Sequence, residues 1–231
     1  MEKSSADHDP DQPVEVVKDG GARHWAAIDA DLAAGRIDEA EWYRRCQAIL
    51  VPHYLAGANP RAQSGHSGDP RRWEGARRPL LAAVDADGTF LDVGCANGHL
   101  MECLREWAAQ DGCALEPYGL DISPELVDLA RRRLPRWADR IWVGNALTWT
   151  PPHRFDYVRT SLDYVPRPRR GEYIAHLLGF CRRLIVGMDN EDPTVREAEE
   201  ELVAMGYRVA GRVEVAHPDP RLARRACWVD S

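Results

Sequence analysis

Lysine is scarce in this sequence, and its scarcity limits which phosphate-binding sites the chain can form. The 231 residues include only Lys3 and Lys18 as lysines. A phosphate-binding P-loop needs the pattern G-x-x-x-x-G-K-[ST], and neither lysine stands in it. The formal net charge of −7 and the pI of about 5.6 disfavour a nucleic-acid or anionic-membrane binder, because phosphate contacts require a cationic face. Arginine supplies the other cationic side chains, so a local arginine-lined site remains open.

Long apolar runs and paired cysteines are also missing. No apolar run approaches the roughly 20 residues that cross a bilayer, and the first residues lack the apolar core of a secretion signal. None of the six cysteines forms C-x-x-C, and their irregular spacing fits neither a zinc site nor a small disulfide scaffold. They are Cys46, Cys95, Cys103, Cys113, Cys181 and Cys227. We expect reduced thiols packed as small hydrophobic groups, no metal site and a cytoplasmic location.

The N-terminal part of the chain changes character near residue 21. Residues 1–20 are acidic, contain proline and have few large apolar groups, which predicts a disordered tail. Residues 23–58 show helical spacing of apolar side chains and predict a pair of helices. Asp38 with Glu41 resembles a capping box that opens the second helix, and Pro52 is expected to end it.

A polar segment follows the helical pair and leads into the main domain. Its glycine, serine, asparagine and proline content predicts a loop through Gly68. Asp69 and Pro70 then form an N-cap and first-turn pair that opens a short helix. We therefore expect a helical cap with a lid loop over 21–84 and the main domain over 85–231.

From Gly88 onward, strand-like and helical patterns alternate. The predicted strands cover 89–93, 115–121, 140–143, 155–161, 183–188, 207–216 and 225–230. The predicted helices cover 98–110, 124–134, 168–182 and 193–205. This alternation predicts an α/β fold with a Rossmann-like, seven-stranded, mostly parallel sheet. The last two strands have no helix between them, so the final strand is expected to be antiparallel.

The segment LDVGCANGHL joins the first strand to the following helix. Asp92 and Val93 close the strand, and the chain turns from Gly94 to Gly98, where glycine lets a ligand approach the backbone. A loop at this end of an open α/β sheet is where ligands bind. A dinucleotide fingerprint starting at Gly94 would need glycine at 96 and 99, where the sequence has Ala96 and His99. This disfavours an NAD(P) dehydrogenase.

Two later strand ends carry polar side chains suited to a nucleoside. Asp121 closes the second strand, and a carboxylate at that position can accept both hydroxyls of a ribose. Asn145 follows the third strand, where its amide can meet an adenine edge. A glycine turn, a ribose acceptor and an adenine reader together describe a nucleoside site without a pyrophosphate.

These motifs resemble the class I S-adenosylmethionine-dependent methyltransferases of the small-molecule type. The segments DVGCANG, GLDIS, GNAL and RFDYVRTSLDYVP match the family's successive motifs over about 86–230. Ala96 replaces the middle glycine of the first motif, and Asn145 replaces a frequent aspartate. The resemblance implies S-adenosyl-L-methionine as cofactor and S-adenosyl-L-homocysteine as product.

The resemblance also implies a set of cofactor-binding positions. They are Asp92, Gly94, Cys95, Ala96, Gly98, Asp121, Ile122, Asn145, Ala146 and Ser161. The glycine loop would pass beneath the methionine and ribose, with Asp92 placing the methionine amino group. Asp121 would hold the ribose hydroxyls and Ile122 would pack on adenine. Asn145 and the backbone of Ala146 would read adenine, and Ser161 would lie near the sulfonium.

The motifs identify the residues that would act on the acceptor less clearly than the cofactor-binding residues. His66, in a glycine- and serine-flanked loop, has the side chain that exchanges protons near neutrality, although a histidine in a polar loop can also be simply solvated. Tyr164, after the fourth strand, is expected to form a wall of the acceptor pocket or to belong to the core. Alignment of the acceptor can carry much of a methyl transfer, so a general base is optional. The [D/N]-P-P-[Y/F] motif of amino-base methyltransferases is absent, which weakens a DNA base as acceptor.

The sequence therefore predicts methyl transfer to a small organic acceptor, without nucleic acid or membrane. Methylation of RNA or protein is an alternative that the acidic net charge disfavours. A non-catalytic S-adenosylmethionine-binding protein is another, and tryptophan or tyrosine side chains filling the acceptor cavity would favour it. The helical pair at 23–58 could cover the acceptor pocket or form a homodimer contact.

Overall fold

The computed structural model describes residues 25–66, 68–191, 194, 196–217 and 219–231. The predicted tail over 1–20 lies outside the described residues. The chain divides into two compact units, residues 1–49 and 50–231. This division falls earlier in the chain than the boundary that we expect after residue 84, and that boundary stays a prediction.

Two helices form the described part of the first unit, as the apolar spacing predicts. They are the helix over 25–33 and α2 (Glu39–Leu55), which continues into the second unit. Ile28, Trp42 and Cys46 form a buried cluster between them. The indole Nε1 of Trp42 donates to Asp29 Oδ1 at 2.7 Å, so the polar edge of the ring is satisfied.

The start of α2 matches the prediction, and its end does not. Asp38 Oδ1 accepts the backbone N–H of Glu41 at 2.8 Å, which confirms Asp38 as the cap. Pro52 was expected to end the helix, and this is wrong, because α2 includes Pro52 and ends at Leu55. The Pro52 carbonyl still accepts the Ala56 N–H at 3.1 Å. A proline near the end of a helix removes one backbone hydrogen bond, and the following turn is retained.

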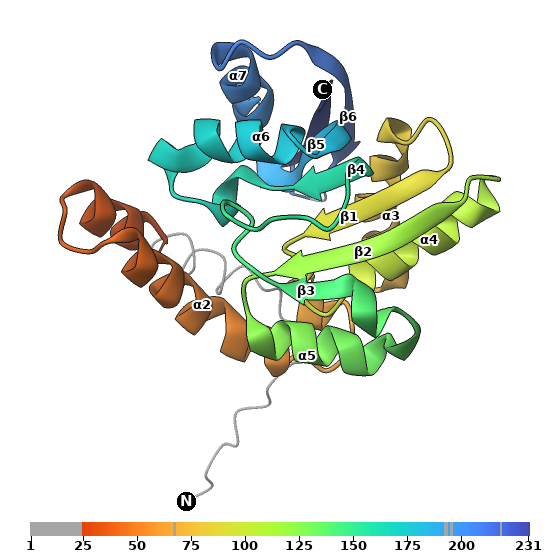
Figure 1. Ribbon diagram of the computed structural model, residues 1–231, viewed down its shortest axis with the longest axis horizontal. Helices are drawn as coiled ribbons and strands as arrows, with labels where there is room; N and C mark the ends of the chain where they lie inside the picture. Colours follow the sequence, from red (N-terminus) through yellow and green to blue (C-terminus); the bar gives the residue numbers. More distant parts are fainter. Residues whose placement is uncertain (1–24, 67, 192–193, 195, 218) are drawn as a thin grey trace, which may run out of the picture. The chain divides into compact units, whose positions relative to one another are not determined.

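A seven-stranded mixed sheet forms the centre of the second unit, which confirms the predicted fold class (Figure 1). Its strands are β1 (Gly88–Val93), β2 (Leu115–Asp121), β3 (Ile141–Val143), β4 (Phe155–Thr160), β5 (Cys181–Glu191), β6 (Val209–Ala216) and β7 (Ala223–Asp230). The strand order is β3-β2-β1-β4-β5-β7-β6. β7 pairs antiparallel with both β5 and β6, as expected for the last strand.

Helices cover both faces of this sheet. One face carries α3 (Pro70–Arg77), the 3-10 helix η2 (Arg78–Ala83), α4 (His99–Gln110) and α5 (Pro124–Arg133). The other carries α6 (Arg170–Leu178) and α7 (Glu197–Ala204), which bury their apolar sides in the largest core cluster. Four further 3-10 turns connect these elements: η1 (Ala62–Ser64), η3 (Pro135–Arg140), η4 (Leu162–Tyr164) and η5 (Arg167–Arg169). No helix within the described residues is both long and apolar enough to cross a membrane.

The helix α6 ends earlier than predicted. The helix expected over 168–182 ends at Leu178, and β5 already begins at Cys181. Gly179 closes the helix, because its N–H donates to carbonyls one turn earlier. The Phe180 carbonyl then accepts the Phe155 N–H at 2.8 Å, which draws the chain into the sheet beside β4.

The turn between β1 and α4 lies at the switch point of the sheet, where β1 has β2 on one side and β4 on the other. Gly94 has φ 72°, a conformation that glycine adopts without strain. Ala96 has φ 47°, also in the left-handed region, although it carries a Cβ. The Asp121 carboxylate accepts the Ala96 N–H at 2.8 Å and fixes this conformation. The turn therefore holds strain at the position where the related family has glycine.

Replacing Ala96 with glycine should stabilise the protein. Removing the Cβ relieves the left-handed strain, and we expect Ala96→Gly to raise the free energy of unfolding by up to about 1 kcal/mol. Urea denaturation followed by circular dichroism measures the change. Ala109→Gly, at an exposed position in α4, is the matched control and should lower stability by up to about 1 kcal/mol. A loss of stability in both variants would contradict the assignment of strain to Ala96.

Candidate functional site

Asp121 ties the end of β2 to the turn that follows β1. Its side chain is buried, one carboxylate oxygen accepts the Ala96 N–H, and the other accepts the Ser123 N–H at 2.9 Å. Burial raises the pKa of Asp121, against the opposing effect of these backbone hydrogen bonds. Each oxygen has a second lone pair. The carboxylate can therefore accept hydroxyl groups while it keeps the turn in place.

Asp92 lies at the end of β1 and is only 1% exposed. Within the described residues, its Oδ1 atom has no hydrogen-bond partner, although Arg159 Nη1 lies 3.6 Å away. Burial raises the pKa of Asp92 to about 6, against the opposing effect of Arg159. Buried carboxylate oxygens are nearly always paired. The arrangement thus offers a buried acceptor for a cationic or N–H group of a ligand.

Cys95 belongs to the glycine turn, and its thiol packs against β2. A Cβ added at Gly119 would lie 2.8 Å from the Cys95 Sγ atom, so the thiol packs tightly against β2. Burial raises the pKa of the Cys95 thiol well above its ordinary value. A protonated, buried thiol is a poor nucleophile. This supports the expectation that Cys95 is a packed small side chain.

Asn97, inside the glycine turn, anchors the segment that precedes the sheet. It is fully buried, its Nδ2 donates to the Pro60 carbonyl at 2.9 Å, and its Oδ1 accepts from Ser64 Oγ at 2.6 Å. Oδ1 also accepts the His99 N–H at 3.0 Å, at the start of α4. The side chain therefore fixes the loop ahead of α3 against the turn.

Asn145 lies in the loop after β3, close to Asp121. The Gly144 N–H donates to the Asp121 carbonyl at 2.9 Å, which holds the start of this loop beside the end of β2. Asn145 Oδ1 accepts the Leu147 N–H at 3.0 Å. Among the described residues, the amide nitrogen of Asn145 has no such contact, so it remains available as a donor. Ile122 and Ala146, predicted to contact adenine, are both half-buried near these strand ends.

The end of β4 brings three further side chains to the same edge of the sheet. Ser161 is 2% exposed, and its Oγ accepts the Asp163 N–H at 3.3 Å. Arg159 Nη1 donates to the Tyr164 hydroxyl at 2.9 Å. A Cβ added at Gly94 would lie 2.5 Å from the Tyr164 ring, so this ring packs directly on the glycine turn.

His66 lies in the anchored loop and contacts Trp73 edge-on, with ring centroids 5.3 Å apart. Its Nδ1 accepts the Gly68 N–H at 2.9 Å, which puts the proton of the neutral ring on Nε2. In this conformation Nε2 can donate a hydrogen bond, and Nδ1 could act as a base only after releasing Gly68. Trp73 is buried in the core cluster of the α3 face, where it packs this helix against the sheet.

The sequence motifs do not indicate two side chains that position the site. Asn97 stands at a variable position of the glycine loop, and only its burial in the structure shows a structural role. Arg159 stands within the apolar strand FDYVRT, and a charged residue inside a buried strand is the signal in the sequence that marks it. The ends of β1, β2 and β3, which carry or precede Asp92, Asp121 and Asn145, are neighbours at the same edge of the sheet.

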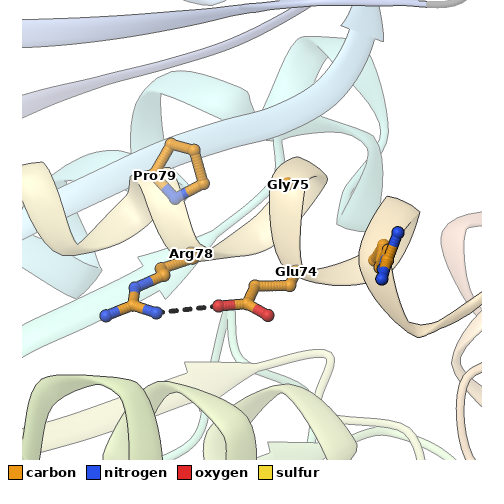
Figure 2. A pocket seen from close by; sticks show the side chains of 5 residues that line it. Glu74, Gly75, Arg78 and Pro79 are labelled. Carbon is orange, nitrogen blue, oxygen red and sulfur yellow. Dashed lines mark hydrogen bonds and ion pairs between the residues drawn. The ribbon is translucent and has the colours of Figure 1, made fainter. Parts of the chain in front are cut away.

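A surface hollow of about 460 Å³ lies on α3 and η2 (Figure 2). It is lined by Arg71, Glu74, Gly75, Arg78 and Pro79. Arg78 pairs with Glu74 at 2.7 Å and with Asp111, at the C-terminal end of α4, at 2.8 Å. None of the predicted site residues lines this hollow.

Comparisons with known proteins agree with this geometry. The model of a methyltransferase domain family matches residues 90–184. A curated relative, trans-aconitate 2-methyltransferase of Methylobacterium radiotolerans, is 37% identical over 91 residues, which are 38% of this chain and 33% of the relative. The aligned part thus spans about a third of the length of that relative.

Solved structures share the fold at low sequence identity. The 1,6-didemethyltoxoflavin-N1-methyltransferase of Burkholderia thailandensis has a TM-score of 0.62 and 18% identity, over 84% of this chain and 91% of that one. The N-methyltransferase NodS of Bradyrhizobium japonicum has a TM-score of 0.52 and 18% identity, over 69% and 94%. With the strand order and the glycine turn, these matches show that residues 90–184 form a methyltransferase domain and that the chain has the fold of the class I S-adenosylmethionine-dependent methyltransferases.

Proposed function

We propose that this chain transfers a methyl group from S-adenosylmethionine to a small organic acceptor. The observation that carries the proposal is the pair of buried carboxylates, Asp92 and Asp121, at adjacent strand ends on either side of the glycine turn. A ligand with an amino group and a ribose would satisfy both. When bound, S-adenosylmethionine supplies an electrophilic methyl group on a sulfonium.

The buried polar atoms fit the two ends of this cofactor. The unpartnered Oδ1 of Asp92 would accept from the methionine amino group, and its neighbour Arg159 keeps the pocket from being purely anionic. Asp121 would accept the ribose hydroxyls with the lone pairs that the backbone leaves open. The free amide nitrogen of Asn145 would donate to an adenine ring nitrogen, with the Ala146 backbone beside it and Ile122 against the ring.

The remaining residues would act on the acceptor and the reacting end. Ser161, at the end of β4, would lie near the sulfonium. Tyr164 would wall the acceptor side of the glycine turn, with its hydroxyl held by Arg159. His66 would donate from Nε2, or take a proton at Nδ1 after its loop opens. Alignment of the acceptor would provide most of the rate, because the displacement requires an in-line approach.

Two related proteins support a small acceptor. One is named for trans-aconitate, and the other has a structure with bound 1,6-didemethyltoxoflavin and S-adenosylhomocysteine. The net charge of −7 argues against RNA as the acceptor. A second candidate, a non-catalytic S-adenosylmethionine-binding protein, draws support from the Tyr164 ring, which packs on the glycine turn where an acceptor would approach.

Asp121→Ala should weaken binding of S-adenosylhomocysteine by at least tenfold, about 1.4 kcal/mol, because the ribose loses its acceptor. Calorimetry measures the affinity, with the exposed Asp128→Ala on α5 as the control that should bind as wild type. Since Asp121 also holds Ala96, the 2′-deoxy analogue separates the two roles. Wild type should bind the analogue more weakly than S-adenosylhomocysteine, and Asp121→Ala should not distinguish the two ligands. If wild type and Asp121→Ala show the same ratio of affinities for S-adenosylhomocysteine and the 2′-deoxy analogue, the ribose assignment is wrong.

Cofactor affinity should fall as the pH drops through about 6. The free protein holds Asp92 with a pKa raised to about 6, so below that pH the carboxyl is neutral and must release a proton to pair with an ammonium group. We expect up to a tenfold loss of S-adenosylhomocysteine affinity per pH unit below 6, measured by calorimetry between pH 5 and 7.5. Asp92→Asn, which cannot ionise, should bind weakly with a flat profile over this range. A steep profile in Asp92→Asn would assign the effect to another group.

The same shift predicts the pH dependence of stability in the unliganded protein. Because the pKa of Asp92 is higher in the folded than in the unfolded state, the folded state binds more protons between about pH 4 and 6. The contribution of Asp92 to stability is therefore present at low pH and is lost as the pH rises through 6. Urea midpoints of wild type and Asp92→Asn at pH 5 and pH 7.5 isolate the contribution of Asp92. The stability of the variant relative to wild type should be higher at pH 7.5 than at pH 5.

Methyl transfer itself is tested by product mass. Protein, S-adenosylmethionine and a metabolite extract should yield a small molecule heavier by about 14 daltons, the mass of an added CH₂, and release S-adenosylhomocysteine. Asp121→Ala at the same concentration is the matched control. Binding of S-adenosylhomocysteine with no mass gain in small molecules, RNA or protein would favour the non-catalytic candidate.

A further inference from the structure

Residues 59–66, which we call the strap, form a compact turn in the connection between α2 and α3. The N–H of Gln63 donates to the Asn59 carbonyl at 3.0 Å, and the N–H of His66 donates to the Arg61 carbonyl at 3.0 Å. Compact surface loops of this length hold their shape through their own contacts. The strap can therefore dock on a neighbouring surface, or leave it, as one unit.

The Asn97 side chain binds the strap with its whole amide group. Its Nδ2 donates to the Pro60 carbonyl at 2.9 Å and to Gln63 Oε1 at 3.3 Å. Its Oδ1 accepts from Ser64 Oγ at 2.6 Å and from the His99 N–H at 3.0 Å. A primary amide has two donor hydrogens and two acceptor lone pairs. All four are used, and three of the four hydrogen bonds reach the strap.

The backbone around Asn97 is held from two other directions. The Asn97 carbonyl accepts from Arg133 Nε of α5 at 3.1 Å, and Arg133 pairs with Glu102 of α4 at 2.6 Å. One residue earlier, the Ala96 N–H donates to the Asp121 carboxylate at 2.8 Å. The strap is thus a third support of the turn that, under the proposed function, passes beneath the cofactor. Helices and strand ends belong to the packed core, whereas a connecting loop is the kind of segment that opens first.

Gly65 sets how closely the strap approaches the end of α2. It has φ 77°, and a Cβ added there would lie 2.5 Å from the Tyr54 hydroxyl oxygen. Alanine at this position would combine backbone strain with a steric conflict, and would displace the strap without altering the glycine turn. Gly112, after α4, is the matched position. Its φ is 81°, and beyond its chain neighbours no heavy atom of the described residues lies within 4 Å of an added Cβ.

We infer that Asn97 is a positioning residue for the cofactor, because it couples docking of the strap to the conformation of the glycine turn that binds S-adenosylmethionine. The inference rests on the proposed function, since it assigns a further residue to the same site. Such coupling is reciprocal, so a ligand that binds the docked form more tightly also shifts the strap toward docking. A ligand with equal affinity for both forms shifts nothing.

Hydrogen exchange of the strap amides measures docking directly, by mass spectrometry on the full chain. The N–H groups of Gln63, Ser64, Gly65 and His66 are hydrogen-bonded, so they exchange when the strap opens. They should exchange faster than the amides of β5, which open only with the whole fold. Free S-adenosylhomocysteine at about ten times its Kd should slow them roughly tenfold, the factor 1 + [L]/Kd for a ligand that binds only the docked form.

Two results of this exchange experiment would overturn the inference. The first is strap exchange that S-adenosylhomocysteine leaves unchanged, because the ligand would then have the same affinity for the docked and open forms. The second is strap exchange as slow as that of β5, because the strap would then have no opening step of its own.

Variants test the same coupling through cofactor affinity. Asn97→Asp keeps the acceptor for the His99 N–H and replaces the donor that faces the Pro60 carbonyl with an oxygen, so it repels the strap and retains the contact within the turn. Calorimetry should show at least fivefold weaker binding of S-adenosylhomocysteine in Asn97→Asp and in Gly65→Ala. Gly112→Ala, which carries similar backbone strain without the steric conflict, should bind within twofold of wild type.

The outcomes separate this inference from the function on which it rests. If wild type does not bind S-adenosylhomocysteine, the proposed function fails. If wild type binds it and Gly65→Ala binds within twofold of wild type, or if Gly65→Ala and Gly112→Ala lose affinity equally, the inference is wrong and the proposed function stands. Should circular dichroism show that Asn97→Asp or Gly65→Ala is unfolded, Ser64→Ala replaces it. Its strap should exchange at least twofold faster than that of wild type, and an unchanged rate would overturn the inference.

Discussion

The hydrogen bond from the Ala96 amide to the Asp121 carboxylate is the contact on which the rest of this site depends. It joins the turn after β1 to the end of β2, and the Asp121 backbone in turn holds the loop after β3 through Gly144. Three strand ends therefore meet at Asp121, two through its carboxylate and its own strand and the third through its backbone carbonyl. A buried carboxylate is costly unless it is paired, and the backbone amides offset that cost while leaving lone pairs for a ligand. The same contact holds Ala96 in a strained conformation, so the geometry of the site is maintained at some expense of stability.

Asp92 and Asp121 are close in the sheet and buried to a similar degree, yet their surroundings differ. Asp121 is stabilised by two amide donors, whereas Asp92 has a guanidinium at 3.6 Å and an oxygen without a hydrogen bond. The consequence is a division of roles. Asp121 is largely committed to the architecture, while Asp92 keeps a buried oxygen without a hydrogen bond, which is the basis of its proposed role toward an amino group. The pKa of Asp92, raised to about 6 by burial, makes that role dependent on pH in the range where cells operate.

Much of the fold could be predicted because apolar periodicity and glycine position encode it directly. All seven strands appear where runs of apolar residues predict them, and Asp38 and Asp69 cap their helices as expected. The continuation of α2 past Pro52 and the early end of α6 at Leu178 could not be predicted, because backbone hydrogen bonds with neighbouring residues determine where these helices end. The site was only partly readable for a similar reason. Residues matched to family motifs could be named, but Asn97 and Arg159 act through partners distant in sequence, Pro60 and Ser64 for one and Asp92 and Gly187 for the other.

Arginine links the distorted part of β5 to the buried end of β1. Net charge governs long-range attraction, whereas a buried group responds to the few charges within several ångströms. Adjacent carbonyls of the distorted strand accept hydrogen bonds from Arg77 and Arg159, and Arg159 also lies 3.6 Å from Asp92. Lysine could not replace Arg159, because a guanidinium has several donors in a fixed plane and can donate to Gly187 and to Tyr164 at the same time. The bulge in β5 and the choice of arginine are therefore parts of one arrangement, which links the local strain at Met188 to the surroundings of Asp92.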